Sequence, residues 1–522
     1  MSAADPGVDP AADQAAADRD EAREFARAFR RFLRWVHHDS DDRARDNPVV
    51  VLVREFLGDG ATAESVVSRG LPVFEHVNLQ AALDAWSSAS GRSVDLHGLH
   101  TPIDHERPRL ESLVGGELHM PLRLGAPSYA DLPNGPGTTL ACLALALLLV
   151  TDERGRYAVL VSGPAEHERG IRLEIAGLPV AAAQEVFAEL DDLRHRLNVY
   201  RGHVIEVSSG GGGVSLSFAP VPQTVREDVI LPAEVLARIE RHALEVARHR
   251  DALRARGQHL KRGVLLFGPP GTGKTLTTGY LVGAMTGYTR FLLSGQSLHA
   301  VGSLAKLARD LEPAVVVLED VDLVAEDRDF GDGASPVLFE LLDAMDGAAA
   351  DADLLFLLTT NRADTLEAAL AARPGRVDVA VEIGLPDAEA RRRLLTRYGR
   401  TVSLELSDTD VDAAVERMEG VTASFVKELL RRAVLESLLD AADDNAAPSE
   451  TVTAVHLNRA LDDLLDSAQE VTRTLLGVGY DPEAMPPPRR PQRRYHGHYL
   501  GLASAGQFGL DVSYDDEYDD ED

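Results

Sequence analysis

The chain contains 522 residues, more than the roughly 250 to 300 residues at which single hydrophobic cores stop growing. The length therefore predicts two folded domains with additional tails. Hydrophobic residues make up 44% of the chain, which is enough for a sizeable core. The formal net charge of −31 argues against sequence-independent binding of nucleic acid, because that binding needs clustered cations to neutralise phosphates.

Three features argue against secretion and against a membrane. The single cysteine, Cys142, cannot form an internal disulfide, so nothing indicates an oxidising compartment. The N-terminus lacks the basic flank and apolar stretch of a secretory signal. The most apolar run, Leu140 to Val150, is about half as long as a membrane-spanning helix. We therefore expect a cytoplasmic protein that makes no membrane contact.

The first part of the chain predicts a disordered lead and then a mixed domain. Residues 1–20 are rich in Ala and Asp and lack helical or strand periodicity. Residues 21–207 predict an α+β domain that binds a partner or substrate, and they contain no HExxH, paired CxxC or GxSxG motif. The expected helices are Glu21–His38, Val49–Leu57 and Val180–Leu197, and the expected strands are Cys142–Val150, Tyr157–Val161 and Ile171–Ile175. A glycine run at Gly210–Gly213 predicts a hairpin loop or a hinge within a linker over residues 208–224.

The second part of the chain alternates short apolar strands with helices over residues 225–385. This alternation predicts a parallel sheet covered on both faces. The expected strands are Val264–Phe267, Arg290–Leu293, Ala314–Leu318, Leu354–Leu358 and Val379–Ile383. Residues 386–467 have helical patterning only and predict a small helical lid. Residues 468–522 are rich in Pro and Arg and end in YDDEYDDED, a run that self-repels and stays solvated, so we expect a disordered tail.

A phosphate-binding loop follows the first of these strands. The string GVLLFGPPGTGKTLTTG matches the Walker A spacing G-x-x-x-x-G-K-[ST] between an apolar strand and a helix. Glycines are needed because side chains would keep the backbone N–H groups from curling around phosphates, and the helix N-terminus adds a favourable dipole. Lys274 is expected to reach the β and γ phosphates of ATP, and Thr275 to ligate Mg²⁺. The residues expected to bind the nucleotide are Gly268, Pro269, Pro270, Gly271, Thr272, Gly273, Lys274, Thr275 and Leu276. The predicted fold class is thus α/β, a P-loop NTPase sheet with a C-terminal helical lid, preceded by the mixed α+β domain.

Further along the chain, the apolar strand in AVVVLEDVD ends in acids. Because the carboxyl ends of parallel strands meet at one edge of a sheet, Glu319 and Asp320 are expected beside the phosphate loop. Carboxylates there can hold the metal and polarise a water. We assign the water to Asp320 and the metal shell to Glu319, and the exchanged assignment stays open.

These motifs, together with the string TTNRADTLEAALAARPGRVD, resemble the AAA family of ring-forming ATPases over about residues 225–467. The resemblance implies that Asn361 positions the attacking water. It also implies that Arg373 and Arg376 are arginine fingers that reach the ATP of a neighbouring subunit. A planar guanidinium suits that role because it can stabilise the γ-phosphate as charge develops. Without the other motifs, RPGR would be interpreted as a surface turn.

Two departures from the family pattern bear on mechanism. Most AAA proteins have Asp before Glu, whereas Glu319 precedes Asp320 here, and LEDVD is similar to the branch that contains the mitochondrial Rieske-protein translocase. In the loop SGQSLHAVGS, Ala300 stands where many unfoldases of the family carry an aromatic residue that grips a threaded polypeptide, and His299 lies beside it. Threading by an aromatic side chain is therefore not expected.

The motifs and the resemblance together predict an ATP hydrolase that assembles as a homo-oligomer, expected to be a hexamer. It would remodel or chaperone a protein client selected by the N-terminal domain. The alternative is an ATP-gated scaffold or switch with slow hydrolysis, which the inverted acid pair and the missing aromatic residue favour. Nucleic acid is a minority interpretation, because the arginines at 489, 490, 493 and 494 are better explained by pairing with the acidic tail.

Overall fold

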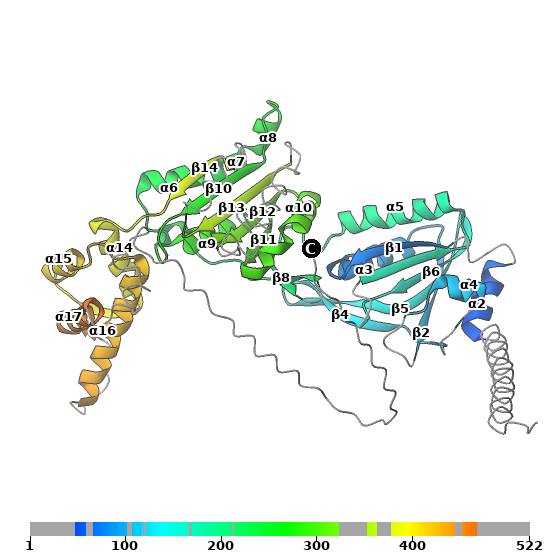
Figure 1. Ribbon diagram of the computed structural model, residues 1–522, viewed down its shortest axis with the longest axis horizontal. Helices are drawn as coiled ribbons and strands as arrows, with labels where there is room; N and C mark the ends of the chain where they lie inside the picture. The colour runs from blue at the N-terminus through cyan, green and yellow to red at the C-terminus, as the bar shows by residue number, and fades with distance from the viewer. Residues whose placement is uncertain are drawn as a thin grey trace, which may run out of the picture. The chain divides into compact units, whose positions relative to one another are not determined.

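The computed structural model describes residues 47–58, 66–101, 107–116, 118, 122–165, 170–210, 213–322, 352–362, 377–443 and 451–466. The predictions for residues 1–20, for the helix at Glu21–His38 and for the tail over residues 468–522 lie outside this part. Within it are two seven-stranded sheets and a helical subdomain (Figure 1). Among the described helices, none has the length and apolar character needed to span a bilayer.

The N-terminal domain is an antiparallel sheet with helices on both faces. The strands run in the order β1-β7-β6-β5-β2-β3, and β4 pairs with β5. The strands are β1 (Val67–Pro72), β2 (Ser93–His100), β3 (Arg123–Gly125), β4 (Ser128–Gly135), β5 (Thr138–Asp152), β6 (Gly155–Ser162) and β7 (Gly170–Ala176). The helices are α2 (Pro48–Leu57), α3 (His76–Ser87), α4 (Leu110–Gly115) and α5 (Val180–Arg196), and a short 3₁₀ turn, η2 (Val73–Glu75), precedes α3.

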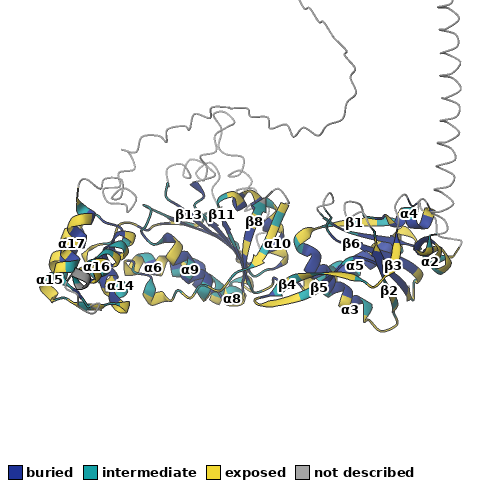
Figure 2. Cartoon of the chain, turned by 90° about the horizontal axis from the view of Figure 1, so that it is seen from below, coloured by how far each residue is buried: buried dark blue, intermediate teal, exposed yellow. Residues whose placement is uncertain are grey.

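Two hydrophobic clusters on opposite faces of this sheet explain the apolar run in β5. Ala146, Leu148 and Val150 pack with α3 and α5, whereas Leu145 and Leu147 pack with α2 and α4. Successive side chains of a strand point to opposite faces, so a strand covered on both faces needs apolar residues at every position. Figure 2 shows this sheet coloured largely as buried between its helices. The run at Leu140 to Val150 is therefore a core strand.

The second sheet is the scaffold of the candidate site. Its strand order is β14-β10-β13-β12-β11-β8-β9, and every neighbouring pair is parallel except β8–β9. The strands are β8 (Val204–Gly210), β9 (Gly213–Phe218), β10 (Arg262–Phe267), β11 (Thr289–Ser294), β12 (Ala314–Glu319), β13 (Leu354–Thr360) and β14 (Val379–Glu382). The helical segments are η3 (Arg226–Asp228), α6 (Ala233–Glu240), η4 (Arg241–Glu245), α7 (Val246–Arg248), α8 (Arg250–Arg254), α9 (Lys274–Ala284), η5 (Gly295–Ala300) and α10 (Val301–Asp310). Each of the five strands expected in this domain lies where the sequence predicts it.

Both faces of the parallel strands are buried, as the alternation of strands and helices predicts. Val315 and Val317 of β12 face α9 and α6 in one cluster, whereas Val316 and Leu318 face α10 in the other. The buried faces explain why these strands are continuous apolar runs.

Of the two alternatives for the linker over residues 208–224, a hairpin and a hinge, the structure shows the hairpin. Gly210 pairs with Gly213, so the glycine run is the end of the β8–β9 hairpin, and β8 adds to the edge of the sheet beside β11. The sheet of the second domain thus begins at Val204, before the expected start at residue 225. The sequence indicated the hairpin loop but not the pairing of β8 with β11, because these strands lie far apart in sequence.

The lid contains α14 (Ala388–Tyr398), α15 (Asp408–Arg417), α16 (Ala423–Asp443) and α17 (Ala454–Leu465), with a 3₁₀ turn η6 (Gly399–Thr401). It is not purely helical, because β15 (Ser403–Glu405) and β16 (Thr451–Thr453) form a short parallel pair. Three residues in each strand give too short a pattern to be detected by periodicity. The pair joins the start of the lid to the segment before α17.

A buried ion pair holds the end of the second sheet that lies opposite the carboxyl ends of its strands. Arg262 donates from Nη1 to Oδ1 of Asp353 at 3.1 Å, and both side chains are almost fully buried. Tyr288 Oη donates to the other carboxylate oxygen at 2.8 Å. Burial raises the pKa of Tyr288 to about 12, and the charge of Asp353 adds to the effect.

Replacing Asp353 with Ala should lower the free energy of unfolding by about 3–5 kcal/mol, because the Arg262 guanidinium would stay buried without its counter-charge. Urea denaturation measures the change. The control is Asp251→Ala, which removes an exposed pair with Arg250 in the same domain and should cost less than about 1 kcal/mol. Equal costs for the two variants would contradict this account of the cluster.

Candidate functional site

The loop between β10 and α9 has a backbone that only glycine adopts easily. Gly268, Gly271 and Gly273 have φ angles of 143°, 77° and 109°. A Cβ atom on Gly268 would lie 2.3 Å from the backbone oxygen of Ile383, which follows β14. One on Gly271 would lie 2.9 Å from Oγ of Ser424 in the lid. The loop therefore lies between the end of the sheet and the lid, and glycine backbone rather than side chains forms these close contacts.

Lys274 begins α9 and turns back over the loop. Its Nζ donates to the carbonyl oxygens of Gly268 at 2.8 Å and Pro269 at 2.9 Å, and the side chain is buried. Burial lowers the pKa of Lys274 to about 8, while the negative charges of Asp320 and Asp322 oppose that shift. The ammonium thus already lies among oxygen acceptors, the kind of partner that phosphate oxygens supply.

The rest of the loop differs in exposure. Thr272 is buried and its Oγ1 donates to the carbonyl oxygen of Pro269 at 2.9 Å, which stiffens the turn. Thr275 and Leu276, in the first turn of α9, are exposed. A hydroxyl exposed at this helix N-terminus is free to reach a metal held by phosphates.

The predicted acids lie at the end of β12, with Glu319 as its last residue and Asp320 directly after it, at the same edge of the sheet. Burial raises the pKa of Glu319, and the charge of Asp320 raises it further. Asp320 has φ 51°, which is rare for a residue with a side chain. Asn361 follows β13, the strand between β10 and β12, and its Nδ2 donates to Oδ1 of Asp320 at 3.2 Å. The structure therefore places Lys274, Asp320 and Asn361 around one region.

Three further predicted positions are the two arginine fingers and the loop position that lacks an aromatic residue. Arg373 and Arg376 lie outside the described residues. Ala300 is buried at the end of η5, and His299 beside it is exposed. The position expected for a gripping aromatic residue therefore presents no side chain to solvent.

Sequence reasoning gave no role to Asp322 and Ser424. Asp322 is buried and accepts hydrogen bonds from residues that end β13. The backbone N–H of Ser424 donates to the carbonyl oxygen of Gly271 at 3.1 Å, so the lid contacts the loop directly. Asp322 could have been found from the sequence, because it is the last acid of LEDVD. The contact between Gly271 and Ser424 could not, because no sequence pattern connects these two positions.

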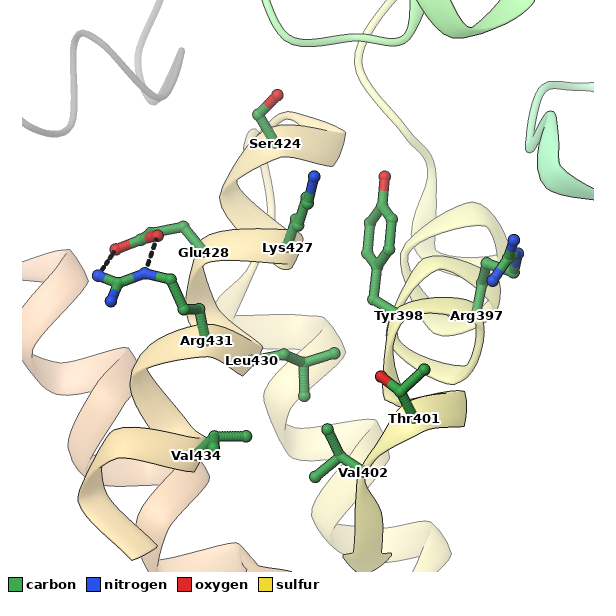
Figure 3. Close-up of a pocket in the computed structure, with 10 residues that line it drawn as sticks. All are labelled: Arg397, Tyr398, Thr401, Val402, Ser424, Lys427, Glu428, Leu430, Arg431 and Val434. Carbon is green, nitrogen blue, oxygen red and sulfur yellow. Dashed lines mark hydrogen bonds and ion pairs between the residues drawn. The ribbon is translucent and has the colours of Figure 1, made fainter. Parts of the chain in front are cut away.

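Ser424 also lies at one end of a groove in the lid. The groove is lined by Arg397, Tyr398, Thr401, Val402, Ser424, Lys427, Glu428, Leu430, Arg431 and Val434. Ser424, Lys427 and Tyr398 point toward the same end of it, and Val402, Leu430 and Val434 form an apolar end (Figure 3). Of these residues, Ser424 also contacts the phosphate loop.

Replacing Gly268 with Ala should destabilise the domain by more than the about 1–3 kcal/mol that its backbone conformation alone would cost, because the new Cβ would overlap the backbone of Ile383. Thermal unfolding measures the loss. The matched control is Gly287→Ala, where φ is 83° and no atom lies within 4 Å of the added Cβ. If both variants lost the same stability, the overlap with Ile383 would make no contribution to the loss at Gly268.

Lys274 should lose its proton near pH 8, below the ordinary lysine pKa, because burial disfavours its charged form. NMR titration of its side chain measures this pKa. Above pH 8 the unfolded chain keeps a proton that the folded chain has lost, so this residue makes the folded state gain stability as pH rises toward the ordinary lysine pKa. A Lys274 that titrated at the ordinary lysine pKa would contradict the burial of its ammonium.

Comparison with known proteins finds the same region. Residues 264–385 match the family model of the ATPase family associated with various cellular activities (AAA). The chain is 27% identical over 285 residues to a cell division cycle protein 48 homolog of Archaeoglobus fulgidus, covering 51% of this chain and 38% of that protein. It is 32% identical over 232 residues to the ATP-dependent zinc metalloprotease YME1L of Drosophila melanogaster, covering 42% and 30%.

The similarity is confined to part of each relative. An ATP-dependent zinc metalloprotease FtsH of Mycoplasmopsis synoviae is 30% identical over 234 residues, covering 42% of this chain and 34% of that protein. The matched region thus spans 30% to 38% of the length of these three relatives. The crystal structure of the FIGL-1 AAA domain aligns with a TM-score of 0.40 at 21% identity, over 49% of this chain and 91% of that one. Residues 264–385 of this chain are an AAA ATPase domain, a parallel-sheet P-loop module of the kind that uses ATP and Mg²⁺.

Proposed function

We propose that the protein hydrolyses ATP in the presence of Mg²⁺ and couples this reaction to work on a protein partner. The observation that carries the proposal is the convergence of Lys274, Asp320 and Asn361 at one edge of the sheet, beside a loop of bare backbone. A cation, a carboxylate and an amide in this arrangement match the needs of phosphoryl transfer to water, which depends on positioning and on electrostatic stabilisation.

The loop residues from Gly268 to Leu276 would hold the nucleotide. Lys274 would exchange the carbonyl oxygens of Gly268 and Pro269 for oxygens of the β and γ phosphates. Thr275 and Glu319 would hold Mg²⁺, whose charge neutralises the phosphate oxygens. The exposure of Thr275 and the position of Glu319 at the end of β12 support these roles.

Asp320 would take the proton of the attacking water. The water oxygen forms the new bond to the γ-phosphorus, the bond to the ADP oxygen breaks, and inorganic phosphate leaves. The hydrogen bond from Asn361 to Asp320 supports Asn361 as the group that orients this water. The alternative assignment makes Glu319 the base and places Asp320 at the metal. The raised pKa of Glu319 supports it, because a higher pKa makes a carboxylate a stronger base.

The remaining roles depend on assembly. Arg373 and Arg376 would stabilise the γ-phosphate of a neighbouring subunit, which requires a homo-oligomeric ring, and a hexamer is the expected size. The N-terminal domain would select the protein client that the ring remodels or chaperones. Relatives named as a cell division cycle protein and as ATP-dependent metalloproteases support ATP-driven action on proteins. The similarity of LEDVD to the Rieske-protein translocase branch stays a prediction.

An ATP-gated scaffold with slow hydrolysis is the second candidate. The buried Ala300 favours the scaffold. A protein that grips a polypeptide needs an exposed side chain at this position in the loop SGQSLHAVGS. The two candidates differ in whether function needs the chemical step or only nucleotide binding.

The test measures Mg²⁺-dependent phosphate release by the purified protein and by two variants. Lys274→Ala should lose ATP binding, and Asp320→Asn should keep binding while kcat falls by about 10²- to 10⁴-fold, the usual contribution of a general base. Lys306→Ala, which removes an exposed lysine of α10, should match wild type. Absence of turnover in the assembled wild type would refute hydrolysis. If the Asp320→Asn variant binds ATP without hydrolysing it, and still assembles and acts on the protein partner as well as wild type, the scaffold is favoured.

A further inference from the structure

Asp322 lies on the turn that follows β12 and is 7% exposed. Its Oδ1 accepts two hydrogen bonds from the end of the neighbouring strand β13, one from Oγ1 of Thr360 at 3.0 Å and one from the backbone N–H of Asn361 at 3.1 Å. A buried carboxylate is costly unless such donors satisfy it. The two donors both lie at the point where Asn361 leaves the sheet.

The backbone before Asp322 turns sharply enough to bring this carboxylate back to β13. Asp320 has φ 51°, and its N–H donates to Oγ1 of Thr359 at 3.0 Å. The N–H of Val321 donates to the carbonyl oxygen of Thr359, also at 3.0 Å. These two hydrogen bonds to Thr359 of β13 therefore compensate for the unfavourable left-handed conformation of Asp320.

These contacts form a closed circuit between the two strand ends. Asp322 holds the backbone of Asn361, the carboxamide of Asn361 holds the carboxylate of Asp320, and the peptide bonds of residues 320–322 complete the loop. A change at any one point moves the other two. The amide of Asn361 can be placed accurately only while its own backbone is held.

We propose that Asp322 is a positioning residue for ATP hydrolysis, which fixes Asn361 so that its carboxamide meets Asp320 and the attacking water. This inference rests on the proposed hydrolysis of ATP. Asp322 acts through the backbone of Asn361, and the separate effect of its charge on Lys274 is tested by a variant that keeps the hydrogen bonds and removes the charge. A purely structural Asp322 would instead stabilise the end of β13 and leave no dependence on the Asn361 side chain.

A double-mutant cycle on kcat separates these two roles, because residues that act through each other are not additive. Asp322→Ala should lower kcat by roughly tenfold to a hundredfold, since small displacements of positioning groups have effects of this size. In an Asn361→Ala background the same substitution should change kcat by less than about twofold, because the side chain through which Asp322 acts is already gone. Affinity for ATP is measured alongside kcat, because the substitution also removes the negative charge that acts on Lys274.

Two further variants control for loss of structure. Asp322→Asn keeps an oxygen that accepts both hydrogen bonds and should restore kcat to within about threefold of wild type. Asp378→Ala removes a carboxylate that accepts from the backbone of Gly263 at 2.7 Å, at the other end of β10, and should leave kcat unchanged.

The outcomes distinguish this inference from the proposal beneath it. If wild type hydrolyses ATP and Asp322→Ala costs the same fold in both backgrounds, or costs nothing, the positioning role is refuted and hydrolysis stands. If wild type releases no phosphate, both fall together. A loss that appears only when Asn361 is present confirms the positioning role.

Discussion

The parallel pairing of β10, β13 and β12 is the constraint on which the candidate site depends. The three strands are in register over their apolar runs and end at the same edge, at Phe267, Thr360 and Glu319. Because β13 lies between the other two, residues that follow it reach both the phosphate loop and the acids. Asn361 follows β13, which explains how an amide far along the chain comes to bond Asp320. At such an edge, where the chain crosses over to a distant strand, α/β proteins bind their ligands.

The lid adds a second constraint on the same loop. Ser424 contacts Gly271 through its backbone, and Arg397 of α14 donates from Nε to Oδ1 of Asp228, in the segment before α6, at 2.7 Å. Ile230 in that segment packs against the core of the lid. A movement of the lid relative to the sheet must therefore alter contacts at the phosphate loop and at the residues that lead into the domain. The position of the lid and the conformation of the phosphate loop are therefore linked through the contact between Ser424 and Gly271.

The strands and the loop were predictable from sequence because their signals are local. An apolar run marks a strand buried on both faces, and glycines at fixed spacing mark a backbone that a Cβ would block, as at Gly268. The pairing of β8 with β11, the β15–β16 pair and the contact between Gly271 and Ser424 were not predictable, because each joins segments far apart in sequence or only three residues long. Asp322 was visible as a letter in a motif, but its partners on β13 exist only once the sheet has formed.

The central claim is that the phosphate loop at this edge of the sheet receives a triphosphate. A crystal structure with Mg²⁺ and a non-hydrolysable ATP analogue tests it most directly. The predicted result is that Nζ of Lys274 leaves the carbonyl oxygens of Gly268 and Pro269 to bond phosphate oxygens, with Asp320 and Asn361 facing the terminal phosphate. An analogue bound elsewhere, with Lys274 still bonded to its own loop, would contradict the account.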